Sequence, residues 1–299
     1  MRPAPHSVTV RLDLAQAVDA LVGLMVGAAV LTVFFDVWLH LGGGLASADL
    51  AALFDATSER GLGSWLSVTQ TVLVALTLWG VVAVVRQSGG ARRRVLGWAV
   101  LAVFFSYLAF DDGTRLHERV GSAFGASGAS ETGLGAAFPS YYWQLVFGPV
   151  FAGVGLFMAA FLWRELRTAR LRGLVGVAFG LMAVAVGLDF VDGLGDGHPW
   201  DLYGRLGARP DLASASEVVF GMSGPDAVVH LSRAVEESVE MAAMTLLWAV
   251  FLTHLGALAG GVRVVWSPVD PRAARRARSA SSDREPVPQP DVSAEPVGA

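Results

Sequence analysis

One short stretch holds the densest group of chemically active side chains in this sequence. Residues Tyr107–Arg119 run from an apolar segment into two aspartates, two arginines, a histidine and a glutamate. Carboxylates and an imidazole at this spacing are the ligand types that first-row divalent metals bind in helix bundles. We therefore expect Asp111, Asp112, His117 and Glu118 to belong to a polar site.

Two other apolar segments end in polar pairs. Asp36 precedes His40 by four residues, and Asp189 precedes Asp192 by three. On a helix these spacings place both members of a pair on one face. Each pair can therefore point toward the same interior as the third segment.

The last apolar segment opens with three glutamates and an arginine on one helical stripe. Such a stripe can supply further carboxylates to a shared site. The candidate metal ligands are Asp36, His40, Asp111, Asp112, His117, Glu118, Asp189, Asp192, Glu236, Glu237 and Glu240.

The mixture of imidazole and carboxylate predicts a divalent metal such as Zn, Mn or Fe, because Ca prefers oxygen ligands alone. With an open position, the metal could activate water for hydrolysis or, if redox-active, take part in oxygen chemistry. The sequence lacks an HExxH zinc motif, a glycine-rich phosphate loop and a nucleophile elbow. The reaction and its substrate therefore stay open.

Composition indicates whether this site lies in a soluble protein or in a membrane protein. Apolar residues make up 54% of the 299 residues, charged residues only 16%, and the mean hydropathy is +0.52. These values are typical of an integral membrane protein. The expected partner is a lipid bilayer and not a nucleic acid, and association between copies of the chain stays open. With no cysteines, the chain has neither disulfides nor thiolate metal sites.

The apolar runs predict an all-α membrane bundle of six transmembrane helices within residues 17–262. A run of about 20 apolar residues spans the roughly 30 Å hydrocarbon core. Residues 1–16 are expected to precede the bundle, 121–140 to form a loop, about 40 residues to connect the last two spans, and 263–299 to be a disordered tail. The expected spans are about 17–41, 64–85, 95–112, 141–163, 173–192 and 235–258.

Arginine placement predicts the orientation. The connections 86–94 and 164–172 carry four arginines each, and the tail segment 263–278 carries five. The 42–63 connection carries only Arg60. By the positive-inside rule both termini are cytoplasmic, as expected for a multi-pass protein of a bacterial plasma membrane. An alternative for the first segment is a signal peptide cleaved after the small residues Ala46–Ala48.

The acids then lie near the outer surface. Asp111 follows Arg94 by 17 residues, and Asp189 follows Arg172 by 17. At 1.5 Å per residue, both carboxylates lie about 25 Å from the cytoplasmic surface. The sequence therefore predicts one polar layer in the outer part of the bilayer.

Two alternatives to a metal site remain. The polar residues could be ion-paired helix ends in an accessory or sensor protein, with Asp111 beside Arg115 and Glu237 beside Arg233. The apolar neighbours of Asp36 argue against this explanation. Proton- or ion-coupled transport is the other alternative, although cytoplasmic halves of the helices such as Leu21–Leu31 and Leu174–Val186 carry no charge.

The pattern Asp111-Asp112-x4-His117-Glu118, together with Glu236-Glu237-x2-Glu240, resembles a group of uncharacterised bacterial six-helix membrane proteins. Members of that group carry Asp-Glu-x4-His-Glu in the third span and Glu-Glu-x2-Glu in the last. This chain has Asp112 where glutamate is usual, which shortens one ligand arm by a methylene. The resemblance implies a six-helix bundle over most of residues 95–258 and no established activity.

Overall fold

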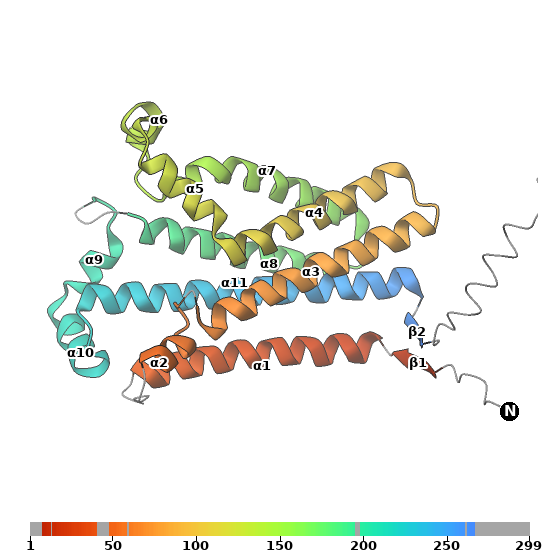
Figure 1. Ribbon diagram of the computed structural model, residues 1–299, viewed down its shortest axis with the longest axis horizontal. Helices are drawn as coiled ribbons and strands as arrows, with labels where there is room; N and C mark the ends of the chain where they lie inside the picture. Colours follow the sequence, from red (N-terminus) through yellow and green to blue (C-terminus); the bar gives the residue numbers. More distant parts are fainter. Residues whose placement is uncertain are drawn as a thin grey trace, which may run out of the picture. The chain divides into compact units, whose positions relative to one another are not determined.

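The structure is a computed structural model that describes residues 8–12, 14–40, 48–58, 60–194, 198–260 and 262–266. Within these residues, six helices are long and apolar enough to cross a membrane. The prediction of a helical bundle with six such segments is confirmed. The helices are α1 (Leu14–His40), α3 (Leu62–Gln87), α4 (Arg92–Thr114), α7 (Tyr142–Glu165), α8 (Ala169–Asp192) and α11 (Gly224–Ala259) (Figure 1).

Helices α3 and α11 form the centre of the bundle. In the most apolar window of α11, 50% of the residues are buried, against 11% in α1 and α7. The core is mostly aliphatic with a few large aromatic rings, and the ring of Trp98 on α4 packs edge-on against Phe161 on α7 and Phe251 on α11. Because α1 and α7 bury so few residues, most of their apolar surface is left for lipid.

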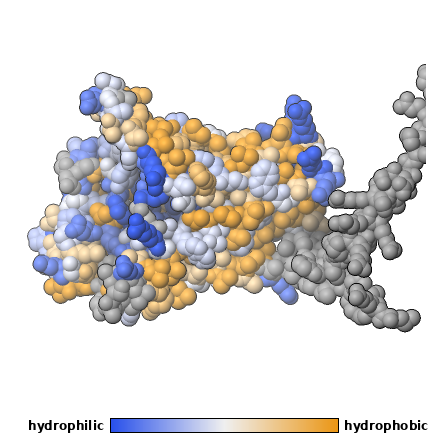
Figure 2. Space-filling view, in the orientation of Figure 1, coloured by the Kyte–Doolittle hydropathy of each residue, from blue (hydrophilic) through white to orange (hydrophobic). Residues whose placement is uncertain are grey.

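The two arginine-rich connections lie at one end of the bundle. Arg94 Nε, in the first turn of α4, donates a 2.7 Å hydrogen bond to Glu165 at the end of α7. The opposite end carries the short helices α2 (Ala48–Phe54), α9 (Leu202–Gly207) and α10 (Pro210–Phe220) (Figure 1). Figure 2 shows apolar residues over the middle of one face of the bundle and hydrophilic residues toward its two ends.

Two connections expected to be loops contain helices: segment 121–140, and the connection between α8 and α11, which holds α9 and α10. Segment 121–140 holds the end of α5 (Leu116–Gly125), the 3-10 helix η1 (Gly128–Glu131) and α6 (Gly133–Ala137). The prediction of a plain loop there is wrong. Glycine, alanine and serine give no apolar period, so short helices made of them leave no signal in the sequence.

Helix α11 begins at Gly224, eleven residues before the expected start at 235. The Ser223 side chain accepts a hydrogen bond from the backbone N–H of Asp226, and Pro225 lies in the first turn. Both features favour a helix start. Gly224 lies so close to the Gly207 carbonyl that a Cβ atom would overlap it, which fixes α9 against this end of α11. Helix α11 is therefore three turns longer at its N-terminal end than the sequence predicted.

A two-stranded antiparallel ribbon belongs to a separate compact unit made of the chain ends. Strand β1 (Val8–Leu12) pairs with β2 (Val262–Trp266), with Val8 opposite Trp266 and Leu12 opposite Val262. The sequence analysis did not predict this ribbon. The rest of the expected tail, residues 267–299, and most of the Ala46–Ala48 cleavage motif lie outside the described residues.

Candidate functional site

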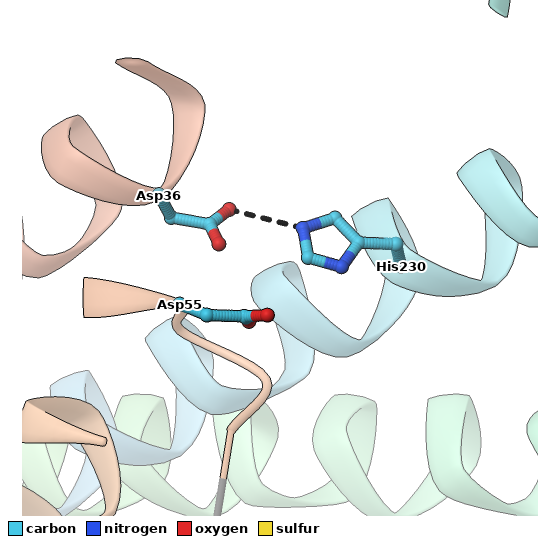
Figure 3. Close-up of side chains that lie close together, drawn as sticks. All are labelled: Asp36, Asp55 and His230. Carbon is cyan, nitrogen blue, oxygen red and sulfur yellow. Dashed lines mark hydrogen bonds and ion pairs between the residues drawn. The ribbon is translucent and has the colours of Figure 1, made fainter. Parts of the chain in front are cut away.

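Three side chains from distant parts of the sequence meet at the end of the bundle that carries α2, α9 and α10. Asp36 lies in the last turns of α1, Asp55 directly follows α2, and His230 lies in the second turn of α11 (Figure 3). One ligand atom from each lies within 4.8 Å of the other two. Within the described part of the chain, this is the one group of three His, Asp or Glu residues with that geometry.

Hydrogen bonds orient all three side chains. His230 Nε2 lies 3.2 Å from Asp36 Oδ2, and the backbone N–H of Ala56 donates to Asp36 Oδ1 over 3.0 Å. The Thr57 hydroxyl donates to Asp55 Oδ1 over 2.7 Å and lies 3.4 Å from His230 Nδ1. Such supporting bonds around an imidazole and its carboxylates are typical of metal sites, where they fix the direction of each ligand.

The spacing of the three groups suits a small cation. Two ligands of a tetrahedral metal lie about 3.3–3.6 Å apart when each bond is about 2.0–2.2 Å. His230 Nε2 and Asp36 Oδ2 are 3.2 Å apart, slightly closer than this, and a ligand atom of Asp55 lies within 4.8 Å of both residues' ligand atoms. A cavity of about 20 Å³ touches Asp36 and His230. This volume holds about one water molecule, so the cluster has room for a metal-bound water.

A second polar group lies deeper in the bundle and contains the other predicted acids. Thr71 on α3 donates a 2.9 Å hydrogen bond to Asp112 Oδ2, and Gln144 on α7 donates a 2.6 Å bond to Asp189 Oδ2. These neutral donors stabilise the two carboxylates and add no positive charge.

The three glutamates of α11 complete this acidic group. Glu236, Glu237 and Glu240 are partly buried and make no hydrogen bond or ion pair with other described residues. The charges of Asp112 and Glu118 act on Glu237, and those of Glu237 and Asp112 act on Glu240. The expected ion pair of Glu237 with Arg233 is absent among the described residues, so that part of the ion-pair explanation is wrong.

His117 contacts Asp111 and Glu118. Arg115 has a left-handed backbone (φ 54°), which ends α4 and starts α5. The chain then turns back, so that the His117 backbone N–H lies 2.8 Å from Asp111 Oδ1 and its Nδ1 lies 2.6 Å from Asp111 Oδ2. Glu118 pairs with Arg115. The structure thus brings Asp111 together with His117, and the side chain of His40 lies outside the described residues.

Asp192 serves as the centre of a brace between three helices. Arg233 Nη2 donates a 2.8 Å hydrogen bond to Asp192 Oδ2, and the Tyr141 hydroxyl donates another over 2.8 Å. Burial, followed by this contact with Asp192, raises the pKa of Tyr141 to about 12. The hydroxyl therefore stays protonated at neutral pH and can donate. Asp192 is engaged by these two donors, unlike the glutamates of α11.

A family comparison covers the region that holds both polar groups. The model of a domain of unknown function, DUF8692, matches residues 23–255. The chain belongs to the DUF8692 family. No curated protein and no solved structure matches the chain. The resemblance to an uncharacterised family is therefore confirmed, while its motifs are not tested by this match.

Of the three residues in the cluster, the sequence analysis found only Asp36. Asp55 lies in a connection without apolar period, and His230 lies in a segment expected to be a loop. One signal could have identified the histidine, because His230 extends the stripe of Arg233 and Glu237 by one turn on a helix. No comparable signal links Asp55 to Asp36 in this DUF8692 sequence.

The brace at Asp192 yields a stability prediction. The Asp192 side chain is only 6% exposed, so Arg233→Ala leaves a buried carboxylate with one donor. We expect a loss of about 1–2 kcal/mol, which lowers the melting temperature in detergent by about 3–8 °C. Arg209→Ala is the control, because its partner Asp211 is 64% exposed and surface pairs contribute about 0–1 kcal/mol. Equal effects of both variants would contradict this role of Arg233.

Proposed function

We propose that this multi-pass membrane protein binds a divalent metal ion through Asp36, Asp55 and His230. The convergence of three ligand atoms within 4.8 Å, from three separate elements, supports the proposal. Asp36 is 2% exposed, so bulk water has little access to its carboxylate. The proposed site contains one of the predicted ligands, Asp36, and two residues that were not predicted, Asp55 and His230.

The ligand chemistry favours Zn, Mn or Fe. One imidazole and two carboxylates form a mixed shell of the kind these metals accept. Three protein ligands leave a position for water, whose pKa falls to about 7 when it is bound to zinc. We propose that the bound metal supplies hydroxide for hydrolysis, which makes the protein a metal-dependent membrane enzyme. The described cavity beside Asp36 and His230 is the place where this water fits.

We further propose that both termini are cytoplasmic in a bacterial plasma membrane, so that the metal site lies at the opposite surface. The ion pair Arg94–Glu165 places the arginine-rich connections at one end of the bundle. Pairing of β1 with β2 fits an even number of spans, which returns the chain to its starting side. Arginine-rich connections favour the cytoplasm.

The metal site is tested by metal content. We expect the wild type, purified in detergent after growth with Zn, Mn and Fe, to hold about one metal per chain by mass spectrometry. Asp55→Asn and His230→Ala each remove a ligand and should lower this content at least tenfold. Asp49→Asn and His198→Ala are matched controls outside the cluster and should keep the metal.

Two further variants locate the site within the bundle. Asp112→Asn and Glu240→Gln lie in the deeper acidic group and should leave the metal content unchanged. Loss of metal in these two variants, with retention in Asp55→Asn, would contradict the proposed ligands and move the site to the acidic group.

A second candidate function is cation- or proton-coupled transport through the acidic group. The observation that favours it is the set of three glutamates on α11 that have no hydrogen-bonded partner in the part of the chain that the structure describes. Ionisable residues without partners inside a membrane bundle are typical of ion pathways. Under this proposal Glu237 and Glu240 bind the coupling cation, together with Asp112 and Asp189.

The acidic group gives a stability prediction that separates the two candidates. Without a bound cation, Glu237→Gln removes repulsion among like charges, so we expect a melting temperature about 2–4 °C higher at pH 8. Ser238→Ala, one position along the helix, is the control and should not show this rise. A lower melting temperature for Glu237→Gln, together with a cation-dependent stabilisation of the wild type only, would instead favour the transport candidate.

The orientation is tested with single cysteines, which the cysteine-free chain allows without background. Ser127→Cys, at the end carrying α5, should react with an impermeant thiol reagent added outside intact cells. Ser88→Cys, between α3 and α4, should react only after the membrane is permeabilised. The reverse pattern would contradict the proposed orientation.

A further inference from the structure

The position of the metal site along α11 places it at the depth of lipid headgroups. Near the other end of α11, His254 stacks on Trp98 at 4.9 Å, and Trp98 donates to Glu165 of the Arg94–Glu165 pair. This ion pair marks the arginine-rich surface. His230 precedes His254 by 24 residues, or about 36 Å of helix. The hydrocarbon core is about 30 Å thick, so His230 lies just beyond it.

The cavity at the site is also lined by apolar residues, two of which are partly exposed. Besides Asp36 and His230, Val37 of α1 and Leu231 of α11 line it, and they are 42% and 45% exposed. Phe220, the last residue of α10, also lines it. We call the gap lined by Val37, Leu231 and Phe220 the lateral opening. Val37 and Leu231 line the cavity and are also partly exposed, so they extend from Asp36 and His230 to the exterior of the bundle.

The surroundings of the lateral opening fit a membrane interface. Trp38, two residues after Asp36, is 41% exposed, and tryptophan is enriched at the level of headgroups. On α10, Val218 and Val219 are 85% and 45% exposed. Large exposed apolar residues next to a polar site are expected where acyl chains, rather than water, contact the protein.

From this arrangement we infer that the substrate is an amphiphile, whose polar head places a carbonyl or phosphoryl oxygen on the metal while its alkyl chain leaves through the lateral opening into the bilayer. This inference rests on the proposed metal site and specifies its substrate class. The polar head contacts Asp36, Asp55 and His230 at the depth of the lipid headgroups. The chain contacts Val37, Leu231 and Phe220, so binding requires no removal of the chain from an apolar medium.

The test compares two metal-binding probes that differ only in chain length. Acetohydroxamate and octanohydroxamate are titrated into cobalt-loaded protein in one detergent, with the visible absorption of Co²⁺ as readout. We expect octanohydroxamate to bind at least about tenfold more tightly, because several methylenes become buried. Val37→Trp and Leu231→Trp fill the lateral opening, whereas Leu76→Trp alters another lipid-facing position that is 62% exposed.

In the two filled variants the preference for the longer probe should fall at least fivefold, while cobalt content and acetohydroxamate affinity stay unchanged. Leu76→Trp should keep the full preference, which controls for partition of the probe into detergent. An equal preference in all four proteins, or none in the wild type, overturns the inference and favours a water-soluble substrate. If the wild type binds no cobalt, metal analysis shows this without any probe. That result contradicts the proposed metal site itself and is distinct from failure of the substrate inference.

Discussion

The free-energy cost of holding charged side chains inside a membrane bundle governs the arrangement of this protein. A charge near the bilayer centre costs about 2.5–3.5 kcal/mol on insertion scales. The acids of both polar groups lie toward one end of the bundle, and several have specific partners, such as His230 for Asp36, His117 for Asp111 and Arg233 for Asp192. The glutamates of α11 are the exception, since they make no hydrogen bond or ion pair with other described residues. A bound cation offsets such charges, and this is the reason that cation binding is proposed for both polar groups.

Helix α11 connects these features along one axis. Its first turns carry His230 and Arg233, its next turns carry the glutamates, and its far end packs His254 against Trp98. The early start at Ser223 brings the His230 imidazole to Asp36, because His230 lies within the first three turns. Close contact between Gly224 and Gly207 holds that start in place. The connection between α8 and α11 thus positions His230 as well as joining two spans.

Much of the fold, but only part of the site, could be predicted from the sequence. Six apolar runs and the arginine-rich connections follow from local composition, so the membrane bundle was predictable. Asp36 was also predictable, because an aspartate among apolar residues needs a partner. Its partners were not, since Asp55 and His230 lie 19 and 194 residues away in segments without apolar period, and only tertiary packing brings them together. His117 shows the same limit, because the left-handed Arg115 redirects it toward Asp111.

X-ray absorption spectroscopy of the zinc-loaded protein tests the central claim most directly. The proposed ligands predict nitrogen and oxygen donors at about 2.0–2.1 Å, with the scattering pattern of one imidazole that disappears in His230→Ala. A shell of oxygen donors alone, or an imidazole pattern that persists in His230→Ala, would contradict a metal site formed by Asp36, Asp55 and His230.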